Sequence, residues 1–325
     1  MTDAETLIAN CLTEAEFPEL PNFHRGKVRD TYALDDGRSV FITTDRQSAF
    51  DRVLAAVPFK GQVLNQTARF WFDRTGDICP NHVIDDPDPN VAIVRQLEML
   101  PVEMVVRSYL TGSTDTAIWP MYERGGRVLY GHPFPDGMKK NQRLDETILT
   151  PTTKGAAGAH DVPITPADAV ARGLVSQARW DELADKSLAL FARGQEIAAR
   201  NGLILVDTKY EFGVDETGVI TLADELHTPD SSRYWIAETY ESRFAAGEDP
   251  DSLDKEFLRL WVSARCDPYS EPIPEIPAET LVEFSGRYIA LYERVTGRAF
   301  ERPRADRPVK ERIRAALART LPEYF

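Results

Sequence analysis

The length of the chain, 325 residues, predicts two or three domains, and its composition, 42% hydrophobic and 28% charged, is that of a globular protein and not of a disordered chain. The formal net charge of −14 argues against a nucleic-acid-binding surface over the whole protein, but it is compatible with a local cationic pocket for an anionic metabolite. No apolar run approaches the ~18 residues needed to cross a membrane, so we expect no membrane partner and a cytoplasmic location.

The N-terminal part predicts a short helix and then a hairpin that carries cations. Residues 3–12 have helical spacing, and residues 26–43 contain two β-prone runs separated by a turn. Lys27 and Arg29 follow Gly26 at alternate positions, so on a strand both side chains would point the same way and could cover phosphates. The alternative is an ordinary solvated strand.

A polar loop and a helix lead to two further strands. The sequence DRQSAFD (45–51) is a polar loop, and apolar residues recur with helical spacing over 61–72. Strands are expected at 91–96 and 104–109, with Pro101 bending the apolar link between them. We expect this link to be an interdomain hinge, where an adenine ring could bond to backbone groups.

Arg107 ends the second of these strands and precedes a Gly-Ser turn at Gly112 and Ser113. A half-buried guanidinium beside such a turn is a candidate anion site, and the alternative is a salt-bridged arginine in a strand-to-helix turn. Residues 150–161 combine hydroxyls, a lysine and glycines without an apolar anchor. This composition predicts a mobile loop, which could close over phosphates or serve only as a connector.

Helices are predicted on both sides of residues 203–225. Thr165 and Pro166 open one helix, and Ser176 caps a long one that ends near Asn201. The later helices are expected at 234–245, 255–264, 279–296 and 309–321. Between residues 298 and 319, eight basic and three acidic residues give a local net charge of +5, which we expect to dock on the chain's own acidic surface rather than on nucleic acid.

The most informative stretch is LILVDTKYEFGVDETGVITLADE (203–225). It begins with an apolar run and continues into charged residues. In a strand, side chains alternate between faces, so Asp207, Lys209 and Glu211 share one face and Thr208 lies on the other. The alternative is a solvated edge strand with alternating charge, but the apolar run is unsuited to a solvent edge.

The same stretch predicts a hairpin that brings further carboxylates to this face. Residues 215–218 supply the turn, and a second β-prone run follows. If the numbers of paired residues sum to 431 or 432, Asp224 or Glu225 lies opposite Asp207. Carboxylate oxygens are the ligands that Mg²⁺ prefers, and Lys209 among them could neutralise a phosphate or a substrate carboxylate.

These features together favour phosphoryl transfer. The chain contains neither G-x-x-x-x-G-K-[ST] nor G-x-G-x-x-G, so a nucleotide would be held in another way. A cationic hairpin, a hinge, an arginine beside a Gly-Ser turn and a carboxylate cluster with an embedded lysine suit a reaction in which metals bridge phosphates and cations stabilise developing charge.

Six segments, in the same order along the chain, resemble SAICAR synthetase, a family of purine biosynthesis. They are GKVRD (26–30), SAFD (48–51), LPVEMVVRSYLTGS (100–113), TPTTK (150–154), VDTKYEFG (206–213) and DELHTPDSSRYW (224–235). The resemblance implies a ligase that uses ATP and Mg²⁺ to join the carboxylate of carboxyaminoimidazole ribonucleotide (CAIR) to the amine of L-aspartate. ADP and phosphate are released, and the carboxylate is activated by phosphorylation before the amine attacks.

The resemblance also implies roles for individual residues. Positions that bind ATP are matched by Lys27, Arg29, Met99, Glu211 and Asp224. Positions that hold the phosphate and carboxylate of the ribonucleotide are matched by Arg107, Ser113, Lys209 and Arg233. The aspartate side is matched by Ser48 and Asp51, and the closing loop by Thr152, Thr153 and Lys154. The catalytic set is Lys209, Asp207 and Glu211, and the metal set is Asp207, Glu211, Asp224 and Asp161.

The implied fold is α+β, with two domains that clasp ATP as in ATP-grasp and kinase-like proteins. We expect a mostly antiparallel sheet domain at 1–100, an α+β domain with the metal and substrate site at 101–235, and an appended helical region at 236–325. We also expect a monomer. Three alternatives remain: a small-molecule kinase of related fold, whose ATP turnover would not depend on L-aspartate; a non-catalytic scaffold; and a nucleic-acid binder that uses residues 298–319.

Overall fold

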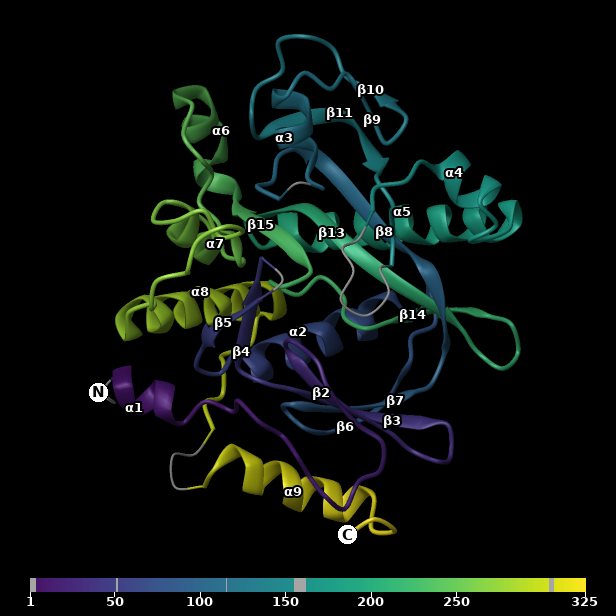
Figure 1. Ribbon diagram of the computed structural model, residues 1–325, viewed down its shortest axis with the longest axis vertical. Helices are drawn as coiled ribbons and strands as arrows, with labels where there is room; N and C mark the ends of the chain where they lie inside the picture. Colours follow the sequence, from purple (N-terminus) through teal and green to yellow (C-terminus); the bar gives the residue numbers. More distant parts are fainter. Residues whose placement is uncertain (1–3, 51, 115, 155–161, 304–306) are drawn as a thin grey trace. The chain divides into compact units, whose positions relative to one another are not determined.

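The computed structural model describes residues 4–50, 52–114, 116–154, 162–303 and 307–325. The chain forms two compact units, each built from helices and antiparallel sheet, and the predicted α+β class is confirmed (Figure 1). Unit 1 comprises residues 1–73, 82–96 and 254–325, and unit 2 comprises residues 74–81 and 97–253. Among the described residues, no helix is long and apolar enough to cross a membrane.

Unit 1 contains a five-stranded antiparallel sheet with the order β1-β2-β3-β7-β6. Its strands are β1 (Phe23–Arg25), β2 (Arg29–Ala33), β3 (Arg38–Thr43), β6 (Val83–Asp88) and β7 (Val91–Arg95); a separate hairpin pairs β4 (Arg46–Ala49) with β5 (Arg52–Ala56). The predicted β2–β3 hairpin is confirmed, and Gly37 takes the positive φ of 83° in its turn. β1 was not predicted, because its three residues are all exposed and show no alternation between a buried and an exposed face.

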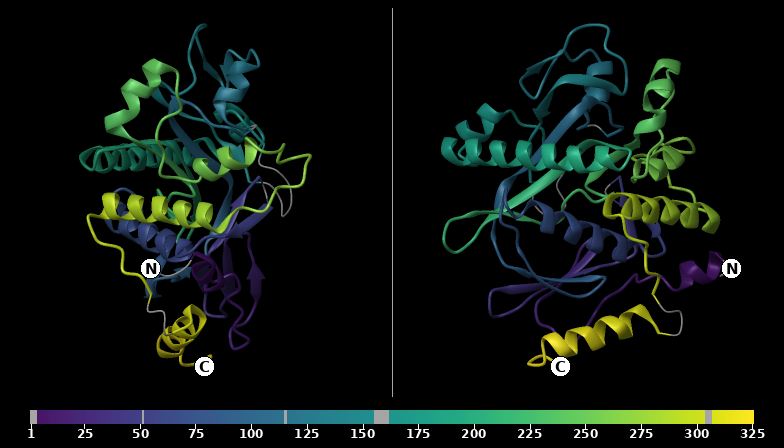
Figure 2. Two further views of the ribbon diagram at one scale, coloured as in Figure 1. Left: turned by 90° about the vertical axis from the view of Figure 1, so that its left-hand side faces the viewer. Right: turned by 180° about the vertical axis from the view of Figure 1, so that it is seen from behind.

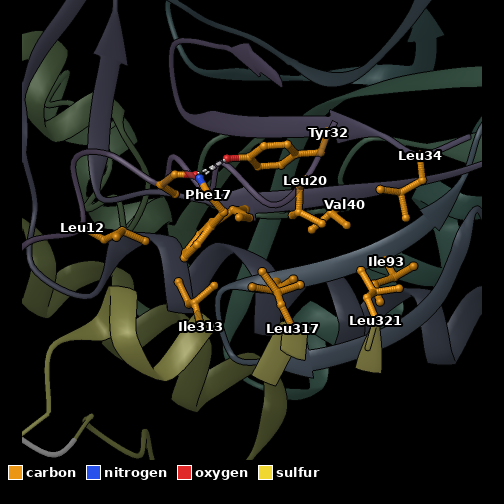
Figure 3. Close-up of a cluster of buried hydrophobic side chains, with 13 residues drawn as sticks. Leu12, Phe17, Leu20, Tyr32, Leu34, Val40, Ile93, Ile313, Leu317 and Leu321 are labelled. Atoms are coloured by element: carbon orange, nitrogen blue, oxygen red, sulfur yellow. Dashed lines mark hydrogen bonds between the residues drawn. The ribbon is translucent and has the colours of Figure 1, made fainter. Parts of the chain in front are cut away.

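The helices of unit 1 come from the N-terminal part and the C-terminal part of the chain, with one of them between β5 and β6. They are α1 (Ala4–Ala9), α2 (Lys60–Thr75), α7 (Glu256–Ser263), α8 (Ala278–Thr296) and α9 (Val309–Thr320). α8 runs beside α2, and its Phe284 packs in the same cluster as Val63 of α2 (Figures 1 and 2). α9 turns Ile313 and Leu317 toward Phe17 and the sheet (Figure 3). The last helices therefore share their cores with the N-terminal half of the chain.

The basic C-terminal segment docks on acidic groups of its own unit, as expected. Arg312 of α9 donates to Asp88 over 2.8 Å and to Asn90 over 2.6 Å. The predicted three-domain division stays a prediction, but the compact units group the chain differently, because residues 254–325 pack with the N-terminal sheet. The boundary between residues 96 and 97 falls at the start of the predicted hinge.

Unit 2 is built on a sheet with the order β11-β8-β13-β14, to which β12 is added on β8 and β15 on β13. Its strands are β8 (Glu98–Leu110), β11 (Gln142–Leu149), β12 (Thr152–Thr153), β13 (Leu203–Val214), β14 (Ile220–Ala223) and β15 (Ser232–Ile236), with a small hairpin of β9 (Val128–Leu129) and β10 (His132–Pro133). Its helices are α3 (Ile118–Glu123), α4 (Pro166–Ala171), α5 (Gln177–Arg200) and α6 (Ala237–Ala246). α5 lies across β8 and β13 (Figure 2).

The helix caps read from the sequence are present in unit 2. The Ser176 hydroxyl accepts the backbone N–H of Arg179 over 3.3 Å, and Thr165 forms a reciprocal capping box with Asp168. The helix expected at 234–245 begins later, at Ala237, because the preceding residues form β15 on the edge of β13.

The expected bend between two separate strands at Pro101 is wrong, because β8 continues through this residue. The pairing between β13 and β8 shifts there: Glu211 lies opposite Glu103, but Gly213 lies opposite Met99. The extra residues of β8 form a bulge, and a bulge tolerates a proline that cannot donate to the ladder.

Candidate active site

Two neighbouring central strands of unit 2 bring the charged residues together. In the β8–β13 register, Glu103 lies directly opposite Glu211 and Arg107 directly opposite Asp207. Because side chains alternate along a strand, Asp207, Lys209 and Glu211 lie on one face. Tyr210 points to the other face of the strand, where its side chain is fully buried. The charged face predicted from alternation is therefore confirmed.

Lys209 is held between two carboxylates. Its Nζ lies 2.6 Å from Glu103 Oε1 and 3.0 Å from Glu211 Oε1, and Lys154 also contacts Glu211. Burial alone would lower the pKa of Lys209, but Glu211, Glu103 and Asp224 outweigh it and raise that pKa above its usual value. Lys209 is therefore a fixed positive charge and is unsuited to act as a general base.

Glu103 is a site residue that the sequence analysis missed. Its carboxylate is buried, and its Oε2 accepts the Thr152 hydroxyl of β12 over 3.1 Å. Thr152 and Thr153 belong to the predicted mobile loop, but they pair with β8 as a short strand. The rest of that loop includes Asp161, a predicted metal ligand, which lies outside the described residues.

Asp207 is clamped by two guanidinium groups. Its Oδ2 accepts from Arg233 over 2.5 Å and from Arg107 over 3.3 Å, and all three side chains are largely buried. Arg107 also donates to the Thr150 hydroxyl over 2.8 Å. The prediction that Asp224 or Glu225 faces Asp207 is wrong, since Arg233 of β15 and Arg107 of β8 occupy the two opposing positions.

The register error has a local cause. The β13–β14 hairpin is confirmed, but its paired residues sum to 434, as in Val214 opposite Ile220. The intervening loop is longer than a tight turn because Asp215 folds it: its Oδ1 accepts the backbone N–H groups of Thr217 over 2.9 Å and Val219 over 3.0 Å. Each additional residue in the loop moves the β14 partner of every β13 residue one position further along the chain.

The Gly-Ser turn after β8 packs closely against this clamp. Gly112 has a φ of 106°, and a Cβ there would lie 3.3 Å from Arg233 Nη2 and 2.4 Å from Ala117 Cβ. Only glycine fits this position without displacement. Ser113 follows it and is exposed. The anion site stays a prediction: Arg107 and Arg233 lie together within one unit, and both are salt-bridged to Asp207.

A tightly bonded loop connects β14 to β15 beside the cluster. It starts with Asp224 at a φ of 62° and contains His227 at a φ of 47°. Tyr210 of β13 bonds to His227 Nε2 over 2.6 Å, and the Tyr234 hydroxyl donates to the His227 carbonyl over 2.8 Å. Burial lowers the pKa of His227 to about 3, so this histidine is neutral and fastens the loop.

The carboxylates that the structure describes do not form an all-protein metal cage. In the part of the chain that the structure describes, no group of three or more His, Cys, Asp or Glu side chains is placed to hold a metal ion. Asp207 is engaged by arginines, whereas Glu211 and Asp224 both lie close enough to Lys209 to raise its pKa. Two carboxylates suit Mg²⁺, which commonly takes one or two protein ligands and completes its shell with water and phosphate oxygens.

Unit 1 places the predicted phosphate-binding cations at the tip of a hairpin. Lys27 is exposed in the turn between β1 and β2, which is closed by a 2.8 Å bond from the Gly26 N–H to the Arg29 carbonyl. Arg29 begins β2, with its guanidinium 5.4 Å from the centre of the Phe41 ring. The expectation that Lys27 is part of a strand is therefore wrong, because the chain reverses direction at this residue.

The remaining predicted site residues are distributed over both units. Met99 lies near the start of β8 and is 39% exposed. Ser48 lies in β4 and is half-buried, and Asp51 is outside the described residues. Two positions before Ser48 in the sequence, Arg46 forms a buried ion pair with Asp30 over 2.6 Å, which was not predicted.

Known proteins resemble this chain in sequence and in fold. The family model described as SAICAR synthetase matches residues 22–276. A phosphoribosylaminoimidazole-succinocarboxamide synthase of Legionella pneumophila is 53% identical over 93% of this chain and 96% of the relative. The solved SAICAR-synthase from Saccharomyces cerevisiae complexed with SAICAR is 32% identical, with a TM-score of 0.75 over 89% of this chain and 99% of its own. A SAICAR synthetase in complex with ADP is 27% identical, with a TM-score of 0.66 over 86% of this chain and 100% of its own.

Proposed function

Because this chain belongs to the SAICAR synthetase family, we propose that it joins the carboxylate of CAIR to the amine of L-aspartate, with conversion of ATP to ADP and phosphate. The observation that carries the proposal is Lys209 of β13, which lies between the carboxylates of Glu103 and Glu211. Relatives named for this reaction and a solved relative with ADP support it. No comparison supports the small-molecule kinase interpretation.

The chemistry requires a good leaving group on a poor acyl donor. A carboxylate oxygen of CAIR attacks the γ-phosphorus of ATP, the bond to the β,γ-bridging oxygen breaks, and ADP leaves. The aspartate amine then attacks the acyl carbon and loses a proton to solvent, and phosphate leaves with one of the original carboxylate oxygens. Both steps bring anions together, so the protein must supply fixed positive charge.

The arginines and lysines of unit 2 are suited to binding the ribonucleotide. Arg107 and Arg233 are oriented by Asp207, which reduces the freedom that they would lose when they bind a phosphate or a carboxylate. Lys209 is proposed to lie against the substrate carboxylate as it is phosphorylated. Lys154, in the closing loop, is proposed to bind the anionic substrate as well. Ser113 is proposed to form a hydrogen bond with the ribonucleotide.

Glu211 and Asp224 are proposed to hold the Mg²⁺ that accompanies ATP. Bound there, the ion would screen the repulsion between the triphosphate and the anionic substrate. Lys27 and Arg29 are proposed to contact the phosphates, and Met99 the adenine. Ser48 and Asp51 are proposed to bind L-aspartate. Thr153, in the closing loop, is proposed to contact the substrate. The monomeric state and the cytoplasmic location stay predictions.

An isotope experiment tests the proposed activation step. CAIR labelled with ¹⁸O in its carboxylate is incubated with ATP, Mg²⁺, L-aspartate and the purified protein, and the phosphate and the amide product are analysed by mass spectrometry. Phosphorylation of the carboxylate predicts one ¹⁸O atom in each phosphate released and the other retained in the amide. Unlabelled phosphate together with amide product would contradict the carboxyl-phosphate route.

A further inference from the structure

One short segment of unit 2 runs along β8, the strand that carries Glu103 and Arg107. It comprises residues 150–154, and its middle forms β12, where Thr152 pairs with Glu103. Just before β12, the backbone N–H of Thr150 donates to a β8 carbonyl over 2.8 Å. The 150–154 segment is therefore held in register against one of the two strands that build the candidate site.

The 150–154 segment contacts charged residues of both parts of the candidate site. Positions 150, 152 and 154 alternate along the chain, which in an extended segment places their side chains on one face. Each of the three meets a different charged residue: Thr150 meets Arg107 over 2.8 Å, Thr152 meets Glu103 over 3.1 Å, and Lys154 meets Glu211. Arg107 belongs to the arginine clamp around Asp207, whereas Glu103 and Glu211 hold Lys209. The segment therefore joins the clamp to the lysine cluster.

Thr152 acts on Lys209 through the carboxylate of Glu103. One oxygen, Oε1, lies 2.6 Å from Lys209 Nζ, and the other, Oε2, accepts the Thr152 hydroxyl over 3.1 Å. Glu103 and Thr152 are both buried, each 4% exposed. The two bonds fix the plane of this carboxylate, because hydrogen bonds to its oxygens are directional. Without the hydroxyl, the carboxylate could turn, and the ammonium group paired with it would move as well.

Thr150 holds the arginine clamp in a comparable way. Its hydroxyl accepts the Nε–H of Arg107 over 2.8 Å and donates to the Val105 carbonyl over 3.4 Å. Thr150 is fully buried, and Nη1 of Arg107 donates to Asp207 over 3.3 Å. The guanidinium is thus bonded to the segment at Nε and to β13 at Nη1. This reduces the rotational freedom that Arg107 would lose when it meets an anion.

We propose that Thr150 and Thr152 are positioning residues for the reaction, through which the 150–154 segment holds the arginine clamp and Lys209 in one fixed arrangement. The effect on catalysis rests on the proposed function, whereas the contacts themselves are those of the structure. Each hydroxyl is used by a protein group, so neither threonine touches the reacting atoms. The segment acts by preorganising charge, which costs no rearrangement at the moment of reaction.

Replacement of each threonine by valine and by serine tests the proposal. Valine keeps the branched shape but removes the hydroxyl. Thr152→Val and Thr150→Val should therefore each lower kcat/KM by about tenfold, the effect of losing one hydrogen bond to a charged group. Thr152→Ser and Thr150→Ser keep the hydroxyl and should stay within about threefold of wild type. Wild-type kcat/KM in the valine variants, or an equal loss with valine and with serine, overturns the proposal.

Thr221→Val is the matched control. Thr221 of β14 is also fully buried in unit 2, but its hydroxyl donates to an uncharged group, the Val219 carbonyl, over 3.2 Å. We expect Thr221→Val to lose stability as Thr152→Val does, while its kcat/KM stays within about twofold of wild type. An equal loss of kcat/KM in both variants would show a general effect of destabilising unit 2, and the proposal would fail.

A double-mutant cycle decides whether Thr152 acts through Glu103. If it does, Thr152→Val/Glu103→Gln should be slower than Glu103→Gln alone by no more than about twofold, and losses that multiply would overturn the proposal. The same cycle, measured on the free energy of unfolding in urea, should show a coupling and needs no activity. If the wild-type protein turns over ATP without needing L-aspartate, the proposed function fails, and the unfolding cycle still decides whether Thr152 and Glu103 are coupled.

Discussion

At the scale of single residues, Lys209 is the charge on which the proposed reaction depends most. It pairs with Glu103 and Glu211 in the free protein, and it is the cation that we propose to meet the substrate carboxylate. Lys209→Met should lower kcat/KM by about a hundredfold or more, because it removes a preorganised charge, and near-normal turnover would contradict the assignment.

Stability measurements separate the two roles of Lys209. Without the lysine, the buried Glu103 faces Glu211 across the strands, so Lys209→Met should lower the free energy of unfolding by about 1 kcal/mol or more. The double variant Lys209→Met/Glu103→Gln should recover part of this stability, because it removes one of the two carboxylates. It should recover no activity, and recovery of turnover would show that Lys209 serves only to balance Glu103.

His227 predicts a defined pH dependence of stability. Its pKa is lowered by burial from 6.5 to about 3, so between these values the unfolded chain binds a proton that the folded protein does not. The contribution of His227 to the free energy of unfolding is fully present above pH 6.5. Between pH 6.5 and pH 3 it falls by about 1.4 kcal/mol for each pH unit.

Urea unfolding of wild type and His227→Gln at several pH values measures this component. The glutamine can still form a hydrogen bond with the Tyr210 hydroxyl but cannot bind the proton. The difference in unfolding free energy, wild type minus variant, should therefore decrease steadily from pH 6 to pH 4. A difference that stays constant over this range would show that the histidine is charged, or titrates normally, in the folded protein.

At the scale of elements, alternation along β13 was predictable and pairing between strands was not. Alternation is a property of a single segment, so it correctly placed Lys209 and Glu211 on one face. Glu103 lies 106 positions from Lys209, and its place in the cluster depends on the register of β8 against β13. No local pattern encodes that register. The predicted register of the β13–β14 hairpin was also wrong, because the loop at Asp215 is longer than a tight turn.

The turn after β8 offers a prediction with a control in the same unit. Gly112 and Gly125 both have positive φ values, 106° and 99°, so alanine costs about 1 kcal/mol or more of backbone strain at either position. Only at Gly112 does the new Cβ meet neighbours, Ala117 and the Arg233 guanidinium, whereas nothing lies within 4 Å at Gly125.

Gly112→Ala should therefore raise the KM for CAIR by about tenfold or more, because it displaces the arginine clamp, whereas Gly125→Ala should leave that KM unchanged. Steady-state kinetics and urea unfolding of the two variants make the comparison. Equal KM values in both would mean that the clamp does not bind the ribonucleotide.

At the scale of the whole molecule, the composition correctly allowed a local cationic site in an acidic protein. Arg107 and Arg233 lie buried around Asp207, although the chain carries a net charge of −14. The grouping of residues 254–325 with the N-terminal sheet could not be read from the sequence. The apolar faces of α8 and α9 indicated that these helices pack, but amphipathic spacing does not identify the partner surface.

The most direct test of the account is ADP release by the purified protein with ATP, Mg²⁺ and CAIR, with and without L-aspartate, while absorbance follows the succinocarboxamide product. The proposed ligase predicts that ADP and product appear together, in equal amounts, and only with L-aspartate. ADP release that is the same without L-aspartate and yields no amide would contradict the central claim.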